Sequence, residues 1–379
     1  MKNRIVEIIV IGAGASGLFL GTELKGRDFL ILEKNSKVGS KMLISGGGKC
    51  NVTNASVKAK NYLGEARFIQ NIIKRFDQDR VLSWLDRRGL SLELRKDNKY
   101  FCKNSAKEIV DLLKREIDSK KIVLQTEVKE VKKRDNIFQI YTNRGVFKTK
   151  KLVIASGGLS FPKLGASSIG YDIALGFGHT IKNLNPALVG FTLQPDEFFF
   201  KSLSGISTEV NIKIGAKEIK GSLLFAHRGV TGLAILNASL YWQKGKIEID
   251  FIPHIDLNSL KNSKKNISNL LGLPNRMAKA FLVKLDIEDK KALYLSSKEW
   301  DRLLTLKRYA FAPAGTFGYS KAEVTKGGIE TNEIKSSSMM SEKESGLYFL
   351  GELLDITGEL GGYNFQWAFS TAFVCAKAI

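Results

Sequence analysis

Residues 4–33 read RIVEIIVIGAGASGLFLGTELKGRDFLILE, and this stretch decides the fold. The β-branched apolar run from Ile5 to Ile11, in which only Glu7 is polar, predicts a buried parallel strand that ends at Gly12. The turn Gly12-Ala13-Gly14-Ala15-Ser16-Gly17 follows, and we expect a helix after it. In chain order, its three glycines would serve a tight turn, backbone approach to a pyrophosphate, and close packing of the helix on the strand.

A second strand is expected at residues 29–32, and it leads to Glu33. This carboxylate can accept hydrogen bonds from both ribose hydroxyls of an adenosine, and it would repel a 2′-phosphate. The N-terminus of the helix offers backbone N–H groups and a partial positive charge to a diphosphate. Strand, glycine turn, helix, strand and acid in this order predict a dinucleotide site, and they leave NAD and FAD both open.

A second glycine-rich segment, residues 38–54, reads VGSKMLISGGGKCNVTN. Three consecutive glycines flanked by hydrogen-bonding side chains do not predict a packed helix or a central strand. A flexible linker would lack such a set of polar side chains and would join separate domains, whereas this segment follows the first strand–helix–strand unit. We therefore interpret it as a loop whose bare backbone contacts a ring system, with Lys49 nearby to stabilise negative charge.

These two motifs and the segment GLYFLGELLDITGELGGYNFQWAFS at residues 346–370 resemble the YhiN/BaiN-like (HI-type) family of bacterial FAD-dependent oxidoreductases, related to aminoacetone oxidases. The similarity runs essentially end to end, and the second and third motifs are more specific than the first. The resemblance implies FAD, bordered by the glycine triplet and the C-terminal segment, and leaves the substrate open. A helix beginning near Gly362 would aim its N-terminus at the flavin and stabilise the anion formed on reduction.

The resemblance also implies an α/β fold: a glutathione-reductase-like Rossmann FAD domain with an inserted small antiparallel β domain and a helical subdomain. In that plan the backbone at Val128 reads the adenine, and the turn after Ala155 passes beneath the cofactor. The predicted cofactor-binding residues are Gly12, Ala13, Gly14, Ala15, Ser16, Gly17, Glu33, Lys34, Lys41, Ser45, Gly46, Gly47, Cys50, Asn51, Val128, Ser156, Gly157, Gly158, Gly351, Glu352, Asp355, Gly362 and Asn364.

Three residues are candidates for a catalytic role, namely Lys49, Cys50 and His227. His227 lies in a family motif, LFAHRGVTG at residues 224–232, and imidazole can donate a proton near neutral pH; a structural histidine is the alternative. Because no cysteines stand in CxxC spacing, we interpret Cys50 as a neighbour of the flavin rather than half of a dithiol. His179 and His254 lack ligand spacing, so no metal site is predicted.

Local patterns predict helices over residues 65–120, with a capping box at Ser105–Glu108 opening one of them. Residues 122–155 predict a parallel strand over 122–128, a hairpin of 137–142 with 146–150, and a return strand over 152–155. The expected domains are the FAD-binding domain at 1–186 and 321–379, an inserted β domain at 187–256 and 310–320, and a helical insertion at 257–309 with a capping box at Ser296–Glu299.

A further glycine pattern, GASSIG at residues 165–170, invites interpretation as a second nucleotide motif. No apolar strand leads into Gly165 and Pro162 lies just upstream, so the context contradicts this interpretation. The chain therefore has no obvious separate NAD(P)H domain, and NAD(P)H remains a candidate electron donor only.

The 379-residue chain carries a formal net charge of +21. One explanation is a surface for RNA, DNA or an anionic membrane. We favour lysine spread over solvated faces, because the tracts at residues 129–134, 148–151 and 261–265 lie far apart and lack interleaved aromatic residues. We expect a cytoplasmic protein for three reasons. The three cysteines are scattered, no apolar run is long enough to span a bilayer, and the first predicted strand leaves no room for a signal peptide.

Together these patterns predict an FAD-binding oxidoreductase that acts on a small organic substrate, with NAD(P)H as a candidate donor and no membrane partner. The flavin would carry out the redox chemistry, while the protein would bind and orient the reactants and supply the electrostatic field around them. Two alternatives stay open: a flavoprotein that binds or modifies RNA, as tRNA-modifying enzymes do, and a flavin redox sensor without turnover.

Overall fold

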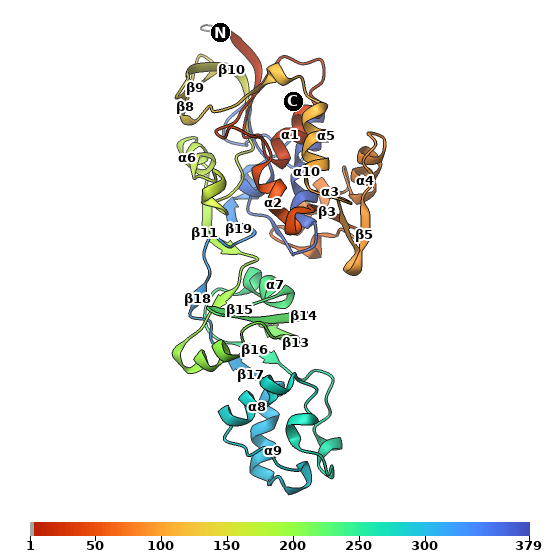
Figure 1. Ribbon diagram of the computed structural model, residues 1–379. Coiled ribbons are helices and arrows are strands. Elements are labelled where there is room, and N and C mark those ends of the chain that lie inside the picture. Colours follow the sequence, from red (N-terminus) through yellow and green to blue (C-terminus); the bar gives the residue numbers. More distant parts are fainter. Residues whose placement is uncertain (1–3) are drawn as a thin grey trace. The chain divides into compact units, whose positions relative to one another are not determined.

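The computed structural model describes residues 4–379, and the chain folds as two compact units. The first unit contains the residues up to 186 together with 323–379, and the second contains 187–322. Each unit has its own hydrophobic core. Figure 1 shows the elements of both units along the chain.

The first unit is built on a parallel sheet around β1 (Ile5–Ile11). β1 pairs in parallel with β2 (Phe29–Leu32) on one side and with β10 (Gly145–Ile154) on the other. Helix α1 (Ala15–Glu23) connects β1 to β2 and lies beside α10 (Tyr363–Ala378), as Figure 1 shows. Apolar side chains of β1 are buried because a parallel sheet is covered on both faces, and the predicted Rossmann-type α/β class is confirmed.

The strands after residue 121 differ in part from the prediction. The expected parallel strand over 122–128 is only β7 (Ile122–Val123), which pairs with β2, whereas Val128 begins the antiparallel strand β8 (Val128–Arg134). The predicted hairpin is confirmed as β9 (Ile137–Thr142) with β10. The return strand is not separate, because β10 runs continuously from the hairpin into the parallel sheet. The sheet order is β7-β2-β1-β10-β9-β8, with β20 (Leu347–Phe349) also paired to β10.

Residues 65–120 are not wholly helical. They contain α3 (Ala66–Ile73), α4 (Gln78–Asp86) and α5 (Lys107–Arg115), but β5 (Glu93–Arg95) and β6 (Lys99–Phe101) lie between α4 and α5. β6 pairs with both β5 and β3 (Asn51–Asn54), which gives the glycine-triplet segment a sheet partner. The predicted capping box at Ser105 is also wrong, because Glu108 accepts hydrogen bonds from the backbone and side chain of Asn104 instead.

The remaining elements of the first unit lie on either side of the inserted segment. They include α2 (Ser40–Gly48), β4 (Tyr62–Leu63), α6 (Ile169–Gly176), β11 (Ile181–Ala187), β19 (Val324–Ile329), η11 (Gly351–Leu353) and β21 (Thr357–Gly358). β11 pairs with β19 and β4 pairs with β21. The C-terminal segment thus returns to the parallel sheet through β20 and then covers α1 with α10.

The second unit contains the expected antiparallel sheet, in the order β17-β16-β13-β14-β15-β12-β18. Its strands are β12 (Phe191–Thr192), β13 (Ser207–Ile214), β14 (Lys217–Ala226), β15 (Gly229–Thr231), β16 (Ile247–Asp250), β17 (Tyr309–Phe311) and β18 (Gly315–Thr316). Helix α7 (Leu233–Tyr241) packs on β13 and β14. The sheet therefore has one face buried against its own helix and phenylalanine-rich core.

The lysine-rich segment 257–309 of the second unit is helical, but its helices are short. Its two α-helices are α8 (Asn275–Lys284) and α9 (Ser297–Leu304). The 3₁₀ turn η7 (Ile267–Asn269) precedes α8, and η8 (Ala292–Tyr294) lies between α8 and α9. The capping box at Ser296 and Glu299 is confirmed. Phe281 of α8 lies against Phe251 and Tyr309 of the sheet region, so this segment shares the core of the sheet.

Candidate cofactor site

The glycine turn after β1 is shaped by close backbone contacts. Gly12 has φ +104°, and a Cβ atom there would lie 2.5 Å from the Ala155 carbonyl oxygen. A Cβ at Gly17 would lie 1.9 Å from the Gly12 carbonyl oxygen, whereas a Cβ at Gly14 would meet no atom within 4 Å. Gly12 and Gly17 are therefore required by the fold itself, and the open space at Gly14 leaves its backbone free for a ligand.

Glu33 organises the end of β2 next to this turn. Its carboxylate is 8% exposed and accepts hydrogen bonds from the backbone N–H of Ala13 (2.7 Å) and of Asn35 (2.8 Å). The backbone of Glu33 also bonds to Val123 and Thr126, which brings the segment leading to Val128 alongside it. Lys34 pairs with Glu127 at 2.9 Å on the surface. The predicted adenosine-binding residues thus lie in one place, held by the sheet.

The glycine triplet interrupts α2. The hydrogen-bond pattern of this helix continues to Gly48, but Ser45 has extended backbone angles, and Gly46 and Gly47 have positive φ values of 56° and 66°. Added Cβ atoms at Gly47 and Gly48 would meet nothing within 4 Å. A regular packed helix is absent here, as predicted, and the segment presents bare backbone to its surroundings.

The end of this segment joins the N-terminus of α10. With the Asn51 amide oriented to satisfy its neighbours, its side-chain oxygen accepts from the Gly362 N–H at 3.0 Å. A Cβ at Gly362, which has φ +92°, would lie 2.5 Å from the Thr53 carbonyl group. Thr53 also donates to Gln366 at 2.6 Å, and both side chains are fully buried. The second and third predicted motifs therefore meet at this helix end.

The first motif meets the third at Gly351. A Cβ at Gly351, φ +63°, would lie 2.4 Å from the Ser16 hydroxyl oxygen, and the Gly351 N–H donates to Thr371 of α10. Ser156 lies next to Gly12, at the end of β10. Its Oγ is buried and has no hydrogen-bond partner within residues 4–379. A buried hydroxyl without a partner is costly, and it marks a polar contact that a ligand can complete.

Lys41 and Glu352 form an ion pair with an Nζ–Oε2 distance of 2.7 Å. The other oxygen of Glu352 accepts from the Thr325 N–H at 2.8 Å, and the Thr325 hydroxyl accepts from the Leu159 N–H at 2.8 Å. A Cβ at Gly158 would collide with both Thr325 and Glu352. Two predicted residues from distant parts of the sequence are thus joined. The sequence analysis did not predict Thr325 as a site residue. The signal that could have indicated it was its position in β19, a strand that contains two glycines.

Asp355 and Asn364 already have protein partners. Asp355 forms an ion pair with Lys182 at 2.9 Å. The Asn364 amide exchanges two hydrogen bonds of 2.9 Å with the backbone of Gly358, which fixes the loop before α10. A direct cofactor contact by Asp355 or Asn364 stays a prediction, because the observed bonds of these side chains are to other protein groups.

Glu323, which precedes β19, is a partly buried carboxyl group. Burial raises its pKa, while the nearby Lys41 opposes this shift.

Two of the three catalytic candidates, Lys49 and Cys50, are consecutive residues at the end of the glycine triplet, and the third, His227, belongs to the second unit. Cys50 is fully buried, and burial raises the pKa of its thiol to about 12. The thiol is therefore protonated near neutral pH, and its left-handed backbone, φ 46°, helps to shape the glycine segment. Lys49 is half-buried beside it. His227 is exposed at the turn between β14 and β15 of the second unit.

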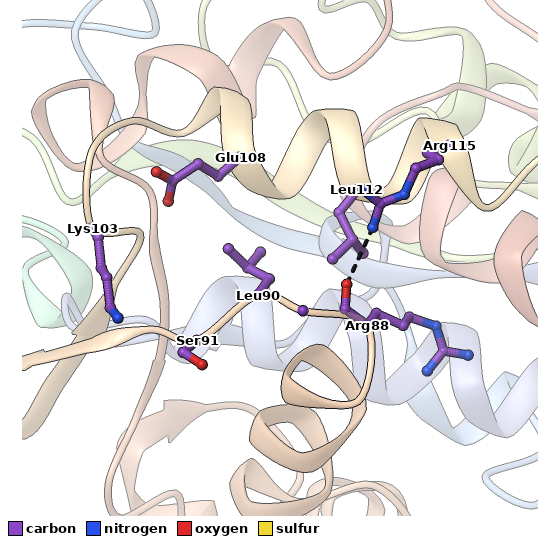
Figure 2. A pocket seen from close by; sticks show the side chains of 8 residues that line it. Arg88, Leu90, Ser91, Lys103, Glu108, Leu112 and Arg115 are labelled. Atoms are coloured by element: carbon purple, nitrogen blue, oxygen red, sulfur yellow. Dashed lines mark hydrogen bonds between the residues drawn. The ribbon is translucent and has the colours of Figure 1, made fainter.

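A separate pocket of about 400 Å³ lies between α5 and the segment after α4. Figure 2 shows its lining of Arg88, Leu90, Ser91, Lys103, Glu108, Leu112 and Arg115, with Gly89 completing it. None of the predicted cofactor residues lines it. Arg88 stacks on Trp84 and Arg115 donates to the Arg88 carbonyl, so two of its cations hold the loop in place. Across residues 4–379, no group of three or more His, Cys, Asp or Glu side chains could hold a metal ion.

A family model for the HI0933-like protein Rossmann domain matches residues 6–378. The chain belongs to this family. It is 38% identical to the ribosomal RNA dihydrouridine synthase of Haemophilus influenzae over 100% of this chain and 99% of that protein. The Escherichia coli ribosomal RNA dihydrouridine synthase is also 38% identical, covering 98% and 97%. The 3-dehydro-bile acid delta(4,6)-reductase of Clostridium scindens is 28% identical, covering 98% of each chain.

Family membership confirms the predicted class, a flavoprotein oxidoreductase with a Rossmann FAD domain. The family relation also confirms the resemblance inferred from the three glycine-rich motifs. Among residues 4–379, none of the helices is both long and apolar enough to cross a bilayer.

Proposed function

We propose that this protein is an FAD-dependent reductase that converts uridine to dihydrouridine in ribosomal RNA. The observation that carries the proposal is the end-to-end identity of 38% with two ribosomal RNA dihydrouridine synthases. The net charge of +21 supports it, because a polyanionic substrate favours a basic protein. The RNA alternative from the sequence thus replaces the small-molecule reading as the main hypothesis.

The first unit fits FAD in three respects. Close backbone packing at Gly12 and Gly17, with open space at Gly14, suits a diphosphate approaching the N-terminus of α1. The buried Ser156 hydroxyl lacks a partner within the described chain. The exposed backbone of the glycine triplet is joined through Asn51 to the N-terminus of α10. We assign the ADP half to residues 12–17 and Glu33, and the ring to the glycine triplet, Gly157 and α10.

When bound, FAD supplies two-electron reduction chemistry. The net reaction adds a hydride equivalent and a proton across the C5–C6 double bond of uracil, while one NAD(P)H is oxidised to NAD(P)⁺. The protein's own residues hold the surrounding elements in place, because the contacts of Glu352 with Lys41 and Thr325 join α2, β19 and η11. The N-terminus of α10 would offer a fixed partial positive charge to the flavin ring.

A small unsaturated molecule is the second candidate substrate. It is favoured by one observation, the 28% identity to a bile acid reductase over 98% of both chains. The lower identity makes it the weaker candidate. Forming dihydrouridine from uridine and the action of a delta(4,6)-reductase both reduce a carbon–carbon double bond, so the reaction class is the same for the two substrates.

The direct test uses a bacterial host from which its own ribosomal RNA dihydrouridine synthase has been deleted. Ribosomal RNA would be digested to nucleosides and its dihydrouridine measured by mass spectrometry, with and without this protein. We expect expression to restore dihydrouridine. The Gly17→Ala variant, which should not bind FAD, is the negative control and should not restore it. Ribosomal RNA without dihydrouridine, in cells that contain the soluble yellow holoprotein, would contradict the proposal.

A further inference from the structure

The positive charge of the second unit is concentrated in its helical segment. Residues 257–309 contain twelve Lys and Arg against five Asp and Glu, a net charge of +7. The rest of this unit, 187–256 and 310–322, contains eight against seven, a net charge of +1. The two parts share one core, so the difference lies on the surface rather than in the packing.

Two stretches of the helical segment are joined side by side. The Ala292 N–H donates to the Lys265 carbonyl at 3.0 Å, and the Leu293 N–H donates to the Ser263 carbonyl at 3.1 Å. The Ile267 N–H donates to the Lys290 carbonyl at 3.0 Å in the opposite direction. The fold therefore places the lysine tract 261–265 against residues 290–294, which the sequence separates by some twenty-five positions.

This junction exposes four lysines and one aromatic ring. Lys261, Lys264, Lys265 and Lys291 are exposed, and within the described chain none of them forms an ion pair. Tyr294 is 64% exposed, so most of its side chain is open to solvent. We call these five residues the lysine–tyrosine surface.

The acidic residues near this surface are mostly engaged elsewhere. Asp289 accepts hydrogen bonds from the backbone and hydroxyl of Ser268 at 3.2 and 2.7 Å. Glu299 pairs with Lys290 at 2.9 Å and also completes the cap of α9. Of the five acidic residues in segment 257–309, Glu288 and Asp301 are exposed and form no ion pair within the described chain. The surface keeps a clear positive excess.

We propose that the lysine–tyrosine surface binds a single-stranded segment of the RNA substrate; this inference rests on the proposed function. The lysines would contact successive phosphates, and Tyr294 would stack on an unpaired base. An exposed ring on a basic surface is suited to unpaired bases, because bases inside a duplex are already stacked. The basic pocket of the first unit lacks this combination, since its Arg88 covers Trp84 and its lining includes Glu108.

The test measures binding of the full-length holoprotein to a fluorescein-labelled oligouridine RNA by fluorescence anisotropy. The test variant carries Lys264→Gln, Lys265→Gln and Lys291→Gln. The matched control carries Lys213→Gln, Lys220→Gln and Lys246→Gln, which are exposed lysines of the sheet part in the same unit. Because each single-strand phosphate contact adds about 0.7 to the logarithmic salt slope, the test variant should lose about 2 from that slope, and the control should lose little.

The aromatic contribution is tested separately. Tyr294→Ala should weaken RNA binding about tenfold, because stacking of one base is typically worth this much, while Tyr294→Phe should bind like the wild type. The flavin of every variant should still be reduced by NAD(P)H at the wild-type rate, which shows that the cofactor unit is intact. Equal RNA affinity in the wild type, the triple test variant and Tyr294→Ala would overturn the proposal.

Dihydrouridine measurement separates this inference from the proposed function. If the wild type modifies ribosomal RNA and the test variants do so with unchanged KM, RNA binding by the lysine–tyrosine surface is refuted and the proposed function is supported. If the wild type forms no dihydrouridine but its RNA binding still depends on the surface, the proposed function is refuted and RNA binding by the surface is supported. Vesicles of equal parts phosphatidylcholine and phosphatidylserine provide a further arm. Surface-dependent binding to vesicles but not to RNA would overturn the RNA assignment.

Discussion

The glycine-rich site of the first unit and the lysine–tyrosine surface of the second are built in opposite ways. The first is defined by main chain in close contact, as at Gly17, where even one added carbon would lie 1.9 Å from a carbonyl oxygen. The second is defined by exposed side chains on short 3₁₀ turns and loops, such as Tyr294 and Lys265. A site made by backbone sterics restricts residue type strictly, whereas a surface made by charge accepts many sequences.

The largest effect should come from the glycine turn itself. Gly17→Ala forces a Cβ against the Gly12 carbonyl, so we expect a loss of at least about 2–3 kcal/mol in unfolding free energy and protein purified without FAD. Gly14→Ala is the matched control, because its Cβ would meet no protein atom within 4 Å. It should unfold at the wild-type urea concentration yet bind FAD more weakly. Equal free energies of unfolding for Gly17→Ala and the wild type would contradict the conclusion that backbone contacts restrict the residue type at this turn.

A side-chain network in the first unit should give a smaller, pH-dependent effect. Burial opposes the ionisation of Glu333, but hydrogen bonds from Lys343, Thr180 and His179 together lower its pKa to about 2. The folded state therefore favours the carboxylate, and this stabilisation is present above the unfolded pKa of about 4.5 and is lost as pH falls toward 2.

His179 adds to the same trend. Its ring contacts Glu333 at 3.0 Å and Ser341 at 2.7 Å, and burial lowers its pKa. Stability thus also decreases as pH falls through the unfolded histidine pKa, about 6.5, because protonation is disfavoured in the folded state. Urea denaturation should show a free energy of unfolding for Glu333→Gln about 1–2 kcal/mol below that of the wild type at pH 7, with the difference shrinking below pH 4. A difference independent of pH would refute the network.

The smallest effect is expected from Cys50. Because its thiol is buried with a pKa raised to about 12, it should resist iodoacetamide at pH 8 in the folded protein. Cys50→Ala should cost about 1 kcal/mol of stability and leave the rate of flavin reduction unchanged. Rapid alkylation, or a large loss of rate with FAD still bound, would place thiol chemistry at the glycine segment after all.

The sequence predicted the parts that depend on local sterics and periodicity. The strand Ile5–Ile11, the glycine turn and the acid at Glu33 follow from residue types at fixed spacing, and they are found as expected. β5 and β6 were missed because each has three residues, with positive-φ Asp97 and Asn98 between them, too short to show alternation. The capping box failed because Asn104, one residue upstream of Ser105, supplies the competing donors to Glu108.

Contacts between distant residues were beyond sequence reasoning. Lys41 and Glu352 were both predicted near the cofactor, but their ion pair joins positions 311 residues apart. From the sequence we favoured a solvated lysine run for the tract Lys261–Lys265, because the basic tracts lie far apart and lack interleaved aromatic residues. In the fold, hydrogen bonds from the backbones of Ala292 and Leu293 to residues 265 and 263 bring the neighbouring Tyr294 to this tract. Without pairing information, a charged tract and a lone tyrosine carry no combined signal.

The most direct test of the central claim is a single-turnover experiment without oxygen. The holoprotein would be reduced with one equivalent of NAD(P)H and mixed with unmodified ribosomal RNA transcript. Visible absorbance follows the flavin, and mass spectrometry counts dihydrouridine. The account predicts that flavin reoxidation requires the RNA and yields one dihydrouridine for each flavin reoxidised. A flavin that stays reduced with the RNA, or reoxidises without forming dihydrouridine, would contradict it.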